Sequence, residues 1–155
     1  MRPALSAIFG CLIGLMLATS GHSHALEPGY LEIVPTEDEQ WQVTWRKPQV
    51  SGDAMKIDAV LPAGCEQRRG GTPRFDGRAY VSGWITSCER PIWEGEVFID
   101  GLSSTATDVL VRFVAEPGTP ATTLRLTPDA PAASLPAAQT AWSVLTSYIT
   151  LGIDH

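Results

Sequence analysis

The sequence predicts an all-β fold, an antiparallel β-sandwich of about seven short strands. Three observations lead to this prediction. Between residues 30 and 127, apolar and polar side chains alternate in short segments, as they do in strands with one buried face. Turn-forming residues separate the segments, and no helical period interrupts them, which excludes a βαβ pattern. Two cysteines, Cys65 and Cys88, bracket the middle of this region.

The clearest strand signal is the segment 40–47. Trp41, Val43 and Trp45 would share one buried face, and the polar residues between them would face solvent. Pro48 is expected to end this strand, because proline has no N–H to donate to a neighbouring strand. The other strands are predicted at residues 30–34, 55–61, 79–88, 94–99, 108–115 and 121–127.

The strand predicted at 79–88 places Trp84 on the same face as Cys88. A tryptophan beside a disulfide resembles the core packing of immunoglobulin domains. The spacing differs from that of true immunoglobulin domains, so the likeness is one of Ig-like architecture alone.

The first 25 residues have the features of a secretory signal peptide. Arg2 gives a positive start, an uncharged apolar run follows over residues 4–18, and Ser23-His24-Ala25 fits a small-residue cleavage site. An uncleaved membrane anchor is the alternative, although the apolar run is short for a span. Cys11 lies inside the run, too early for a lipoprotein, and is expected to be lost with the signal.

Removal of residues 1–25 leaves ten basic and seventeen acidic residues, a net charge of −7. An acidic domain argues against nucleic acid as a partner and against electrostatic docking on anionic lipid. In the oxidising compartment that export implies, Cys65 and Cys88 are expected to form a disulfide. Such a bridge would contribute about 3 kcal/mol to stability. Two separate buried thiols are the alternative.

The composition changes at Pro128. Residues 128–138 have the composition of a Pro/Ala linker, and residues 139–155 show the only convincing helical pattern. No charged residue occurs from 140 to 153, and a helix apolar on most faces requires burial or a membrane. The apolar residues that recur at the 3-4-4 spacing of a helix are Trp142, Leu145, Ile149 and Ile153. The predicted order is a signal peptide (1–25), a β-sandwich domain (26–127), a linker (128–138) and an apolar helix (139–155).

Five segments after the signal carry a family resemblance: ALEPGYLE (25–32), WRKP (45–48), LPAGC (61–65), DVLVR (108–112) and YITLGIDH (148–155). They resemble exported members of the HupE/UreJ family, the hydrogenase and urease accessory membrane proteins. The order and spacing of the segments together are fairly specific. The resemblance covers nearly all of the chain after the signal.

The resemblance implies an extracytoplasmic domain, on the periplasmic side of the inner membrane, that precedes a multi-helix membrane domain resembling a nickel permease. In the family the first membrane helix begins near a Gly-x-[Asp/Glu]-His signature, which residues 152–155 match. No transmembrane helices follow in this sequence. The chain is therefore expected to be the accessory domain of a metal (nickel) uptake protein, cut before its membrane helices as a fragment or a truncated reading frame.

The partners implied are the membrane or the chain's own missing transmembrane domain, and a protein in the periplasm. The full-length protein would be membrane-associated. The alternative function is a free-standing periplasmic β-sandwich that binds other proteins without metal chemistry.

By the same resemblance, Asp154 and His155 would belong to a metal site of the full-length protein, because carboxylate and imidazole suit Ni²⁺. Adjacent helix residues point about 100° apart, so this pair alone would chelate an ion poorly, and a frayed terminus is the alternative. His22 and His24 would form an N-terminal copper or nickel site only if cleavage followed Gly21. No resident cofactor is expected in this chain.

The remaining candidates are an arginine cluster and a set of tryptophans. The arginines would bind an anion or form a solvated loop, and the tryptophans would anchor the core or form a ligand platform. No Ser-His-Asp set or phosphate loop occurs, and His155 would be the only histidine left after cleavage, so an enzyme is not expected. The two sets are Arg68, Arg69, Arg74 and Arg78, and Trp41, Trp45, Trp84 and Trp93.

Overall fold

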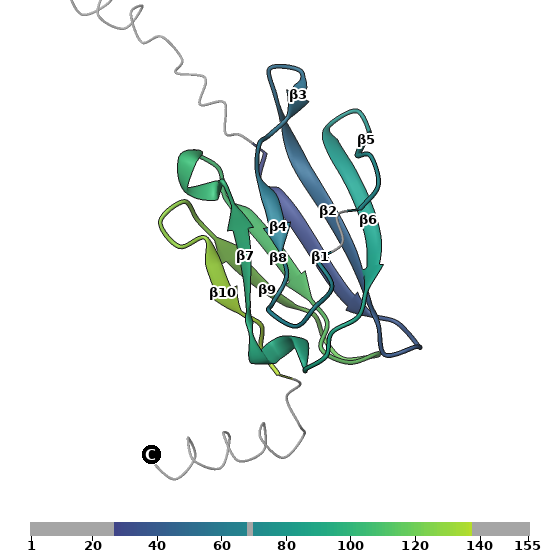
Figure 1. The fold of residues 1–155 in the computed structure, drawn as a ribbon. Coiled ribbons are helices and arrows are strands. Elements are labelled where there is room, and N and C mark those ends of the chain that lie inside the picture. Colours follow the sequence, from purple (N-terminus) through teal and green to yellow (C-terminus); the bar gives the residue numbers. More distant parts are fainter. Residues whose placement is uncertain (1–26, 68–69, 138–155) are drawn as a thin grey trace, which may run out of the picture.

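The computed structural model describes residues 27–67 and 70–137, which form two β-sheets in a sandwich-like arrangement (Figure 1). The first sheet has the strand order β5-β6-β2-β1-β8-β9, with β3 paired to the end of β2. The second sheet has the order β10-β7-β4. The strands are β1 (Gly29–Pro35), β2 (Trp41–Val50), β3 (Asp53–Ala54), β4 (Asp58–Val60), β5 (Arg74–Phe75), β6 (Ala79–Thr86), β7 (Glu96–Asp100), β8 (Val109–Phe113), β9 (Thr122–Leu126) and β10 (Ala132–Ser134).

The prediction of a purely antiparallel fold is wrong at the centre of the first sheet. There β1 pairs antiparallel with β2 but parallel with β8, in a register that runs from Gly29↔Val109 to Ile33↔Phe113. The chain between β1 and β8 is long enough for the crossover that a parallel pair requires. Side chains alternate in the same way in parallel and antiparallel strands, so the sequence pattern alone did not reveal the direction.

The prediction that Pro48 ends the second strand is also wrong, because β2 continues to Val50. Pro48 pairs with Ala79 at the last position of the β2–β6 register, where its missing N–H breaks no continuing ladder. Its carbonyl oxygen accepts a 2.9 Å hydrogen bond from the backbone N–H of Met55. Proline is therefore accommodated at the end of the pairing, and the strand bends into the hairpin with β3.

Both sheets contribute to one hydrophobic core. The predicted inner face of β2 is confirmed, because Trp41, Val43 and Trp45 are all buried. The Trp41 ring stacks on Phe113 of β8 with a centroid distance of 5.5 Å. The second sheet supplies Val97 and Ile99, and the first sheet supplies Leu31, Ile33, Val43, Trp45, Val109, Val111, Phe113 and Leu126.

Several predicted strands are shorter than expected. Within 55–61 only Asp58–Val60 forms a strand, although Met55, Ile57 and Leu61 are buried as the alternation predicts. The strand predicted at 79–88 ends at Thr86, and the one at 94–99 starts at Glu96 because Ile92–Glu94 forms a 3-10 helix, η1. A second 3-10 helix, η2 (Leu102–Ser104), follows β7.

The segment predicted as a Pro/Ala linker contributes to the fold, so the boundary placed at residue 127 is wrong. Ala132–Ser134 forms β10, which pairs antiparallel with β7. Leu135 directly after it is 2% exposed and belongs to the core. Proline and alanine are poor strand formers, but an edge strand needs partners on one side only, which tolerates this composition.

The predicted signal peptide (1–25) and apolar helix (139–155) lie outside the described residues. Within residues 27–67 and 70–137, no helix combines the length and the apolar character needed to cross a membrane.

Candidate functional site

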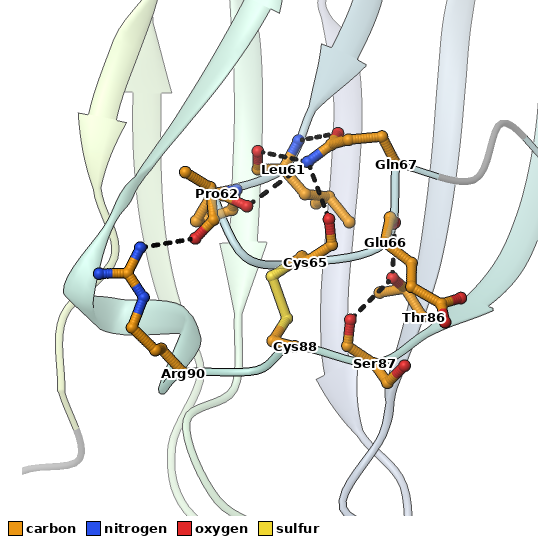
Figure 2. The surroundings of a disulfide bond; sticks show 10 residues. Leu61, Pro62, Cys65, Glu66, Gln67, Thr86, Ser87, Cys88 and Arg90 are labelled. Atoms are coloured by element: carbon orange, nitrogen blue, oxygen red, sulfur yellow. Dashed lines mark hydrogen bonds between the residues drawn. A yellow bond between two sulfur atoms is a disulfide. The ribbon is translucent and has the colours of Figure 1, made fainter.

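The predicted disulfide between Cys65 and Cys88 is present, and it joins the two sheets (Figure 2). Cys65 follows β4 of the second sheet, and Cys88 follows β6 of the first. The two cysteines are also antiparallel bridge partners. Hydrogen bonds flank the pair: the Glu66 N–H donates to Ser87 O at 2.9 Å, and the Glu89 N–H donates to Gly64 O at 2.8 Å.

The side chain of Gln67, next to the disulfide, forms hydrogen bonds with the segment that follows β4 (Figure 2). Its side-chain amide donates to Leu61 O at 2.9 Å and accepts from the Leu61 N–H at 3.2 Å. A primary amide that makes both bonds to one residue imitates the pairing of a neighbouring strand. Gln67 thereby covers the backbone just beyond β4, which is an end strand of the second sheet.

A pocket of about 370 Å³ lies beside this connection, between β4 of the second sheet and β2 and β6 of the first. Figure 1 shows β4 in front of the first sheet. The volume is within the range of small-ligand sites. The aromatic, charged and amide side chains of its lining are Trp45, Lys47, Asp58, Gln67, Trp84 and Asp100.

Charged groups lie on two walls of this pocket. Lys47 of β2 forms an ion pair with Asp58 of β4, so the pair bridges the two sheets. Asp58 is also the register partner of Asp100 on β7, which places two carboxylates opposite each other on adjacent strands. Like charges in such positions destabilise a sheet. The Asp100 carboxylate has no ion-pair or hydrogen-bond partner within the described part of the chain, so among the described lining residues its negative charge has no paired cation.

Two of the residues that line the pocket are tryptophans with buried indole N–H groups. The Nε1 atoms of Trp45 and Trp84 are buried and have no hydrogen-bond partner among the described residues. An unpaired buried donor costs about 1–3 kcal/mol, and native structures contain few of them. The volume of the pocket, its charged side chains and its two tryptophans make it the candidate functional site.

Six of the site residues predicted from the sequence fall outside the described residues. These are Asp154 and His155, the histidines His22 and His24, and the arginines Arg68 and Arg69. Of the rest of the arginine cluster, Arg78 is exposed and its Nε donates to Glu27 at 3.1 Å. Arg74 is exposed on β5.

The tryptophans follow the core interpretation. Trp41 and Trp45 are buried, and Trp84 and Trp93 are partly buried against the core. Trp45 and Trp84 also line the pocket, so for these two the core and platform interpretations both apply. Sequence alternation placed each of them on an inner face but gave no sign that β4 would leave a space beside them.

Within residues 27–67 and 70–137, no group of three or more His, Cys, Asp or Glu side chains is placed to hold a metal ion. No protein-family model matches this sequence, and no curated protein matches it.

The turn between β5 and β6 provides a pH-dependent contribution to stability. Asp76 Oδ1 accepts from the Ala79 N–H at 2.9 Å and the Arg78 N–H at 3.0 Å, and Oδ2 pairs with Arg46 at 2.6 Å. The backbone hydrogen bonds from Ala79 and Arg78 lower the pKa of Asp76 below its ordinary value of 3.8, and Arg46 lowers it further. A depressed folded-state pKa means that the ionised carboxylate stabilises the fold above about pH 4.

We expect Asp76→Asn to lower the urea midpoint at pH 7, and the difference from the wild type to vanish as the pH falls through the folded-state pKa. Protonated aspartic acid then resembles asparagine, so the advantage of the charge is lost. Urea unfolding between pH 7 and pH 3 measures this. The control is Asp53→Asn on β3. Asp53 is exposed, and its carboxylate makes no hydrogen bond or ion pair in the described part of the chain. An equal Asp76→Asn effect at every pH would contradict the prediction.

Proposed function

We propose that this chain is an exported, Ig-like accessory domain of a HupE/UreJ-like membrane protein that takes up nickel, and that it catalyses no reaction itself. The observation that carries the proposal is the placement of the segments behind the resemblance. Three of them lie on adjacent strands at the centre of the first sheet. Residues 25–32 enter β1, residues 45–48 lie on β2, and residues 108–112 enter β8. Leu31 of β1 is the register partner of Trp45 on one side and Val111 on the other.

The charged residues of these three segments support a structural role for them. Each forms an ion pair within the domain, and one pair joins two segments directly, since Arg112 bonds to Glu32 at 2.7 Å. The other pairs are Glu27–Arg78, Arg46–Asp76, Lys47–Asp58 and Asp108–Arg125. Residues that build the centre of a domain are those that relatives sharing its fold would keep, so the resemblance favours a shared domain rather than a shared site.

The fourth segment, residues 61–65, ends at the disulfide that joins the sheets. Disulfides persist in oxidising compartments, which supports an exported location. A cross-linked sandwich suits a domain that must remain folded outside the cytoplasm. Its role would be to dock on, gate or feed the permease, with the metal bound by the membrane domain rather than by this one.

Deletion of the part of the gene that encodes residues 27–137 should lower cellular nickel several-fold in a strain whose other nickel importers have been removed. The physical reason is that the permease would lose its extracytoplasmic domain and deliver less metal per unit time. Elemental analysis of washed cells grown in limiting nickel measures the effect. The gene should restore nickel content when supplied intact, and should fail when codons 2–25 are removed and the chain is not exported.

Cellular zinc provides the internal control, because a nickel-specific role leaves zinc content unchanged. Unchanged nickel content in the deletion strain would refute the proposed role in uptake. It would favour the alternative, a free-standing periplasmic β-sandwich that binds other proteins without metal chemistry. Affinity purification from the periplasm would then identify the bound protein.

A further inference from the structure

The pocket between the sheets has the chemistry of a site for an organic cation. Its lining carries the carboxylates of Asp58 and Asp100 from the second sheet and the ammonium of Lys47 from the first. Lys47 is bonded to Asp58, and its side chain is only 14% exposed. Asp100 is exposed, and no cation is paired with it in the part of the chain that the structure describes. Among the described residues, the pocket therefore presents one carboxylate without a paired cation next to a neutralised pair.

The first sheet also supplies aromatic side chains to the lining. Trp84 of β6 is partly buried, and its ring lies close to the backbone of Gly70, where an added Cβ would meet the Trp84 Cε3 atom at 2.8 Å. This close contact fixes the position of the ring. An indole face attracts ammonium and guanidinium groups more strongly than other aromatic side chains do. A carboxylate and an indole that line the same pocket are two groups that recognise such a cation.

Two tryptophans contribute to the lining of this pocket. Trp45 lines the pocket, is 2% exposed, and has an indole N–H without a partner in the described part of the chain. The same is true of the Trp84 N–H. Both nitrogen atoms are buried, so a ligand in the pocket would contact the indole rings rather than these N–H groups.

We propose that this pocket binds an alkylammonium or guanidinium group, either on a small amine or on the basic side chain of a peptide. Asp100 accepts hydrogen bonds from the cation, and Trp84 covers its other side. Asp58 remains bonded to Lys47 and keeps that lysine from neutralising the site. An anionic ligand is disfavoured, because the one cation in the described lining is already paired. The inference does not depend on a role in nickel uptake.

The test is a titration of the protein, purified from its complete coding sequence, with n-butylammonium and with the peptide acetyl-Gly-Lys-Gly-amide, followed by tryptophan fluorescence. Saturable quenching at about millimolar concentrations is expected for at least one probe, as for weak fragment-sized ligands. Asp100→Asn should weaken binding about tenfold, since it removes a charge-assisted hydrogen bond. Trp84→Phe should remove most of the fluorescence change.

Asp129→Asn is the matched control, an exposed acid in the turn between β9 and β10. It should leave the affinity unchanged. Asp100→Asn should melt no lower than the wild type, because it relieves the repulsion with Asp58, so its weaker binding will not reflect unfolding. Tighter binding of the peptide than of butylammonium identifies a peptide side chain as the ligand, and equal affinity identifies a small amine.

Three results would overturn the proposal. One is the absence of saturable quenching by either probe. Another is an equal loss of affinity in Asp100→Asn and Asp129→Asn. The third is binding of n-butanol, which has a similar chain without the charge, as tightly as butylammonium, because this would show that only apolar contact is recognised.

Discussion

Replacing both cysteines of the disulfide, Cys65→Ala with Cys88→Ala, should lower the free energy of unfolding by about 3 kcal/mol. The two cysteines are 23 positions apart, and the loop that they close contains β5 and β6. Without the bond, the unfolded chain gains conformational freedom, which favours unfolding. The bridge also ties β6 in the first sheet to the segment after β4 in the second. Urea unfolding of both proteins measures the loss.

Reduction provides the control for this prediction. A reducing agent should destabilise the wild type by a similar amount and should leave the double variant unchanged. A loss below about 1 kcal/mol would contradict the entropic argument, since removal of a native disulfide from a small domain typically costs 2–5 kcal/mol. It would mean that the hydrogen bonds of Glu66 to Ser87 and of Glu89 to Gly64 hold the two segments together without the covalent bond.

The sequence predicted the faces of strands better than their partners. Alternation identified the buried residues of β2 because the pleat forces successive side chains to opposite sides of a strand. The disulfide followed from the presence of two cysteines after the predicted signal. Neither argument contains information about which strands become neighbours, so the parallel pairing of β1 with β8 was missed.

The last strand was missed for a different reason. Residues 128–138 have the composition of a linker, and local propensity gave no reason to place a strand there. Leu135 is the one large apolar residue of this segment, and it fills the core beside β10. Tertiary packing of a single side chain, together with the free edge of β7, outweighed the weak propensity of the alanines at 132 and 133.

The candidate pocket could not have been predicted from the sequence. Its residues come from segments far apart in the chain, and the contact between Lys47 and Asp58 depends on how the two sheets are placed. The signals that the sequence did contain were two inward tryptophans and scattered aspartates. Only the structure shows that Asp100 lies opposite Asp58 on the neighbouring strand, where it has no partner in the described part.

Gly101→Ala should destabilise the domain by about 3 kcal/mol, from left-handed backbone strain plus an overpacked contact. Gly101 follows β7 and begins η2 with φ of +78°, a conformation that costs other residues free energy. An added Cβ would lie 2.5 Å from the Lys56 carbonyl oxygen. That carbonyl belongs to the backbone, so it cannot rotate away. The Lys56–Ile57 segment would have to move, and Ile57 is 1% exposed in the core.

Gly118→Ala separates the two contributions to this effect. Gly118 has nearly the same φ, +79°, but a Cβ there would meet nothing within 4 Å. It should cost only the backbone strain, about 1 kcal/mol. Thermal and urea unfolding of both variants give the difference, which reports the contact with Lys56 alone. Equal losses in the two variants would show that the backbone near Lys56 yields without cost, and that the packing of β4 against β7 is looser than the structure indicates.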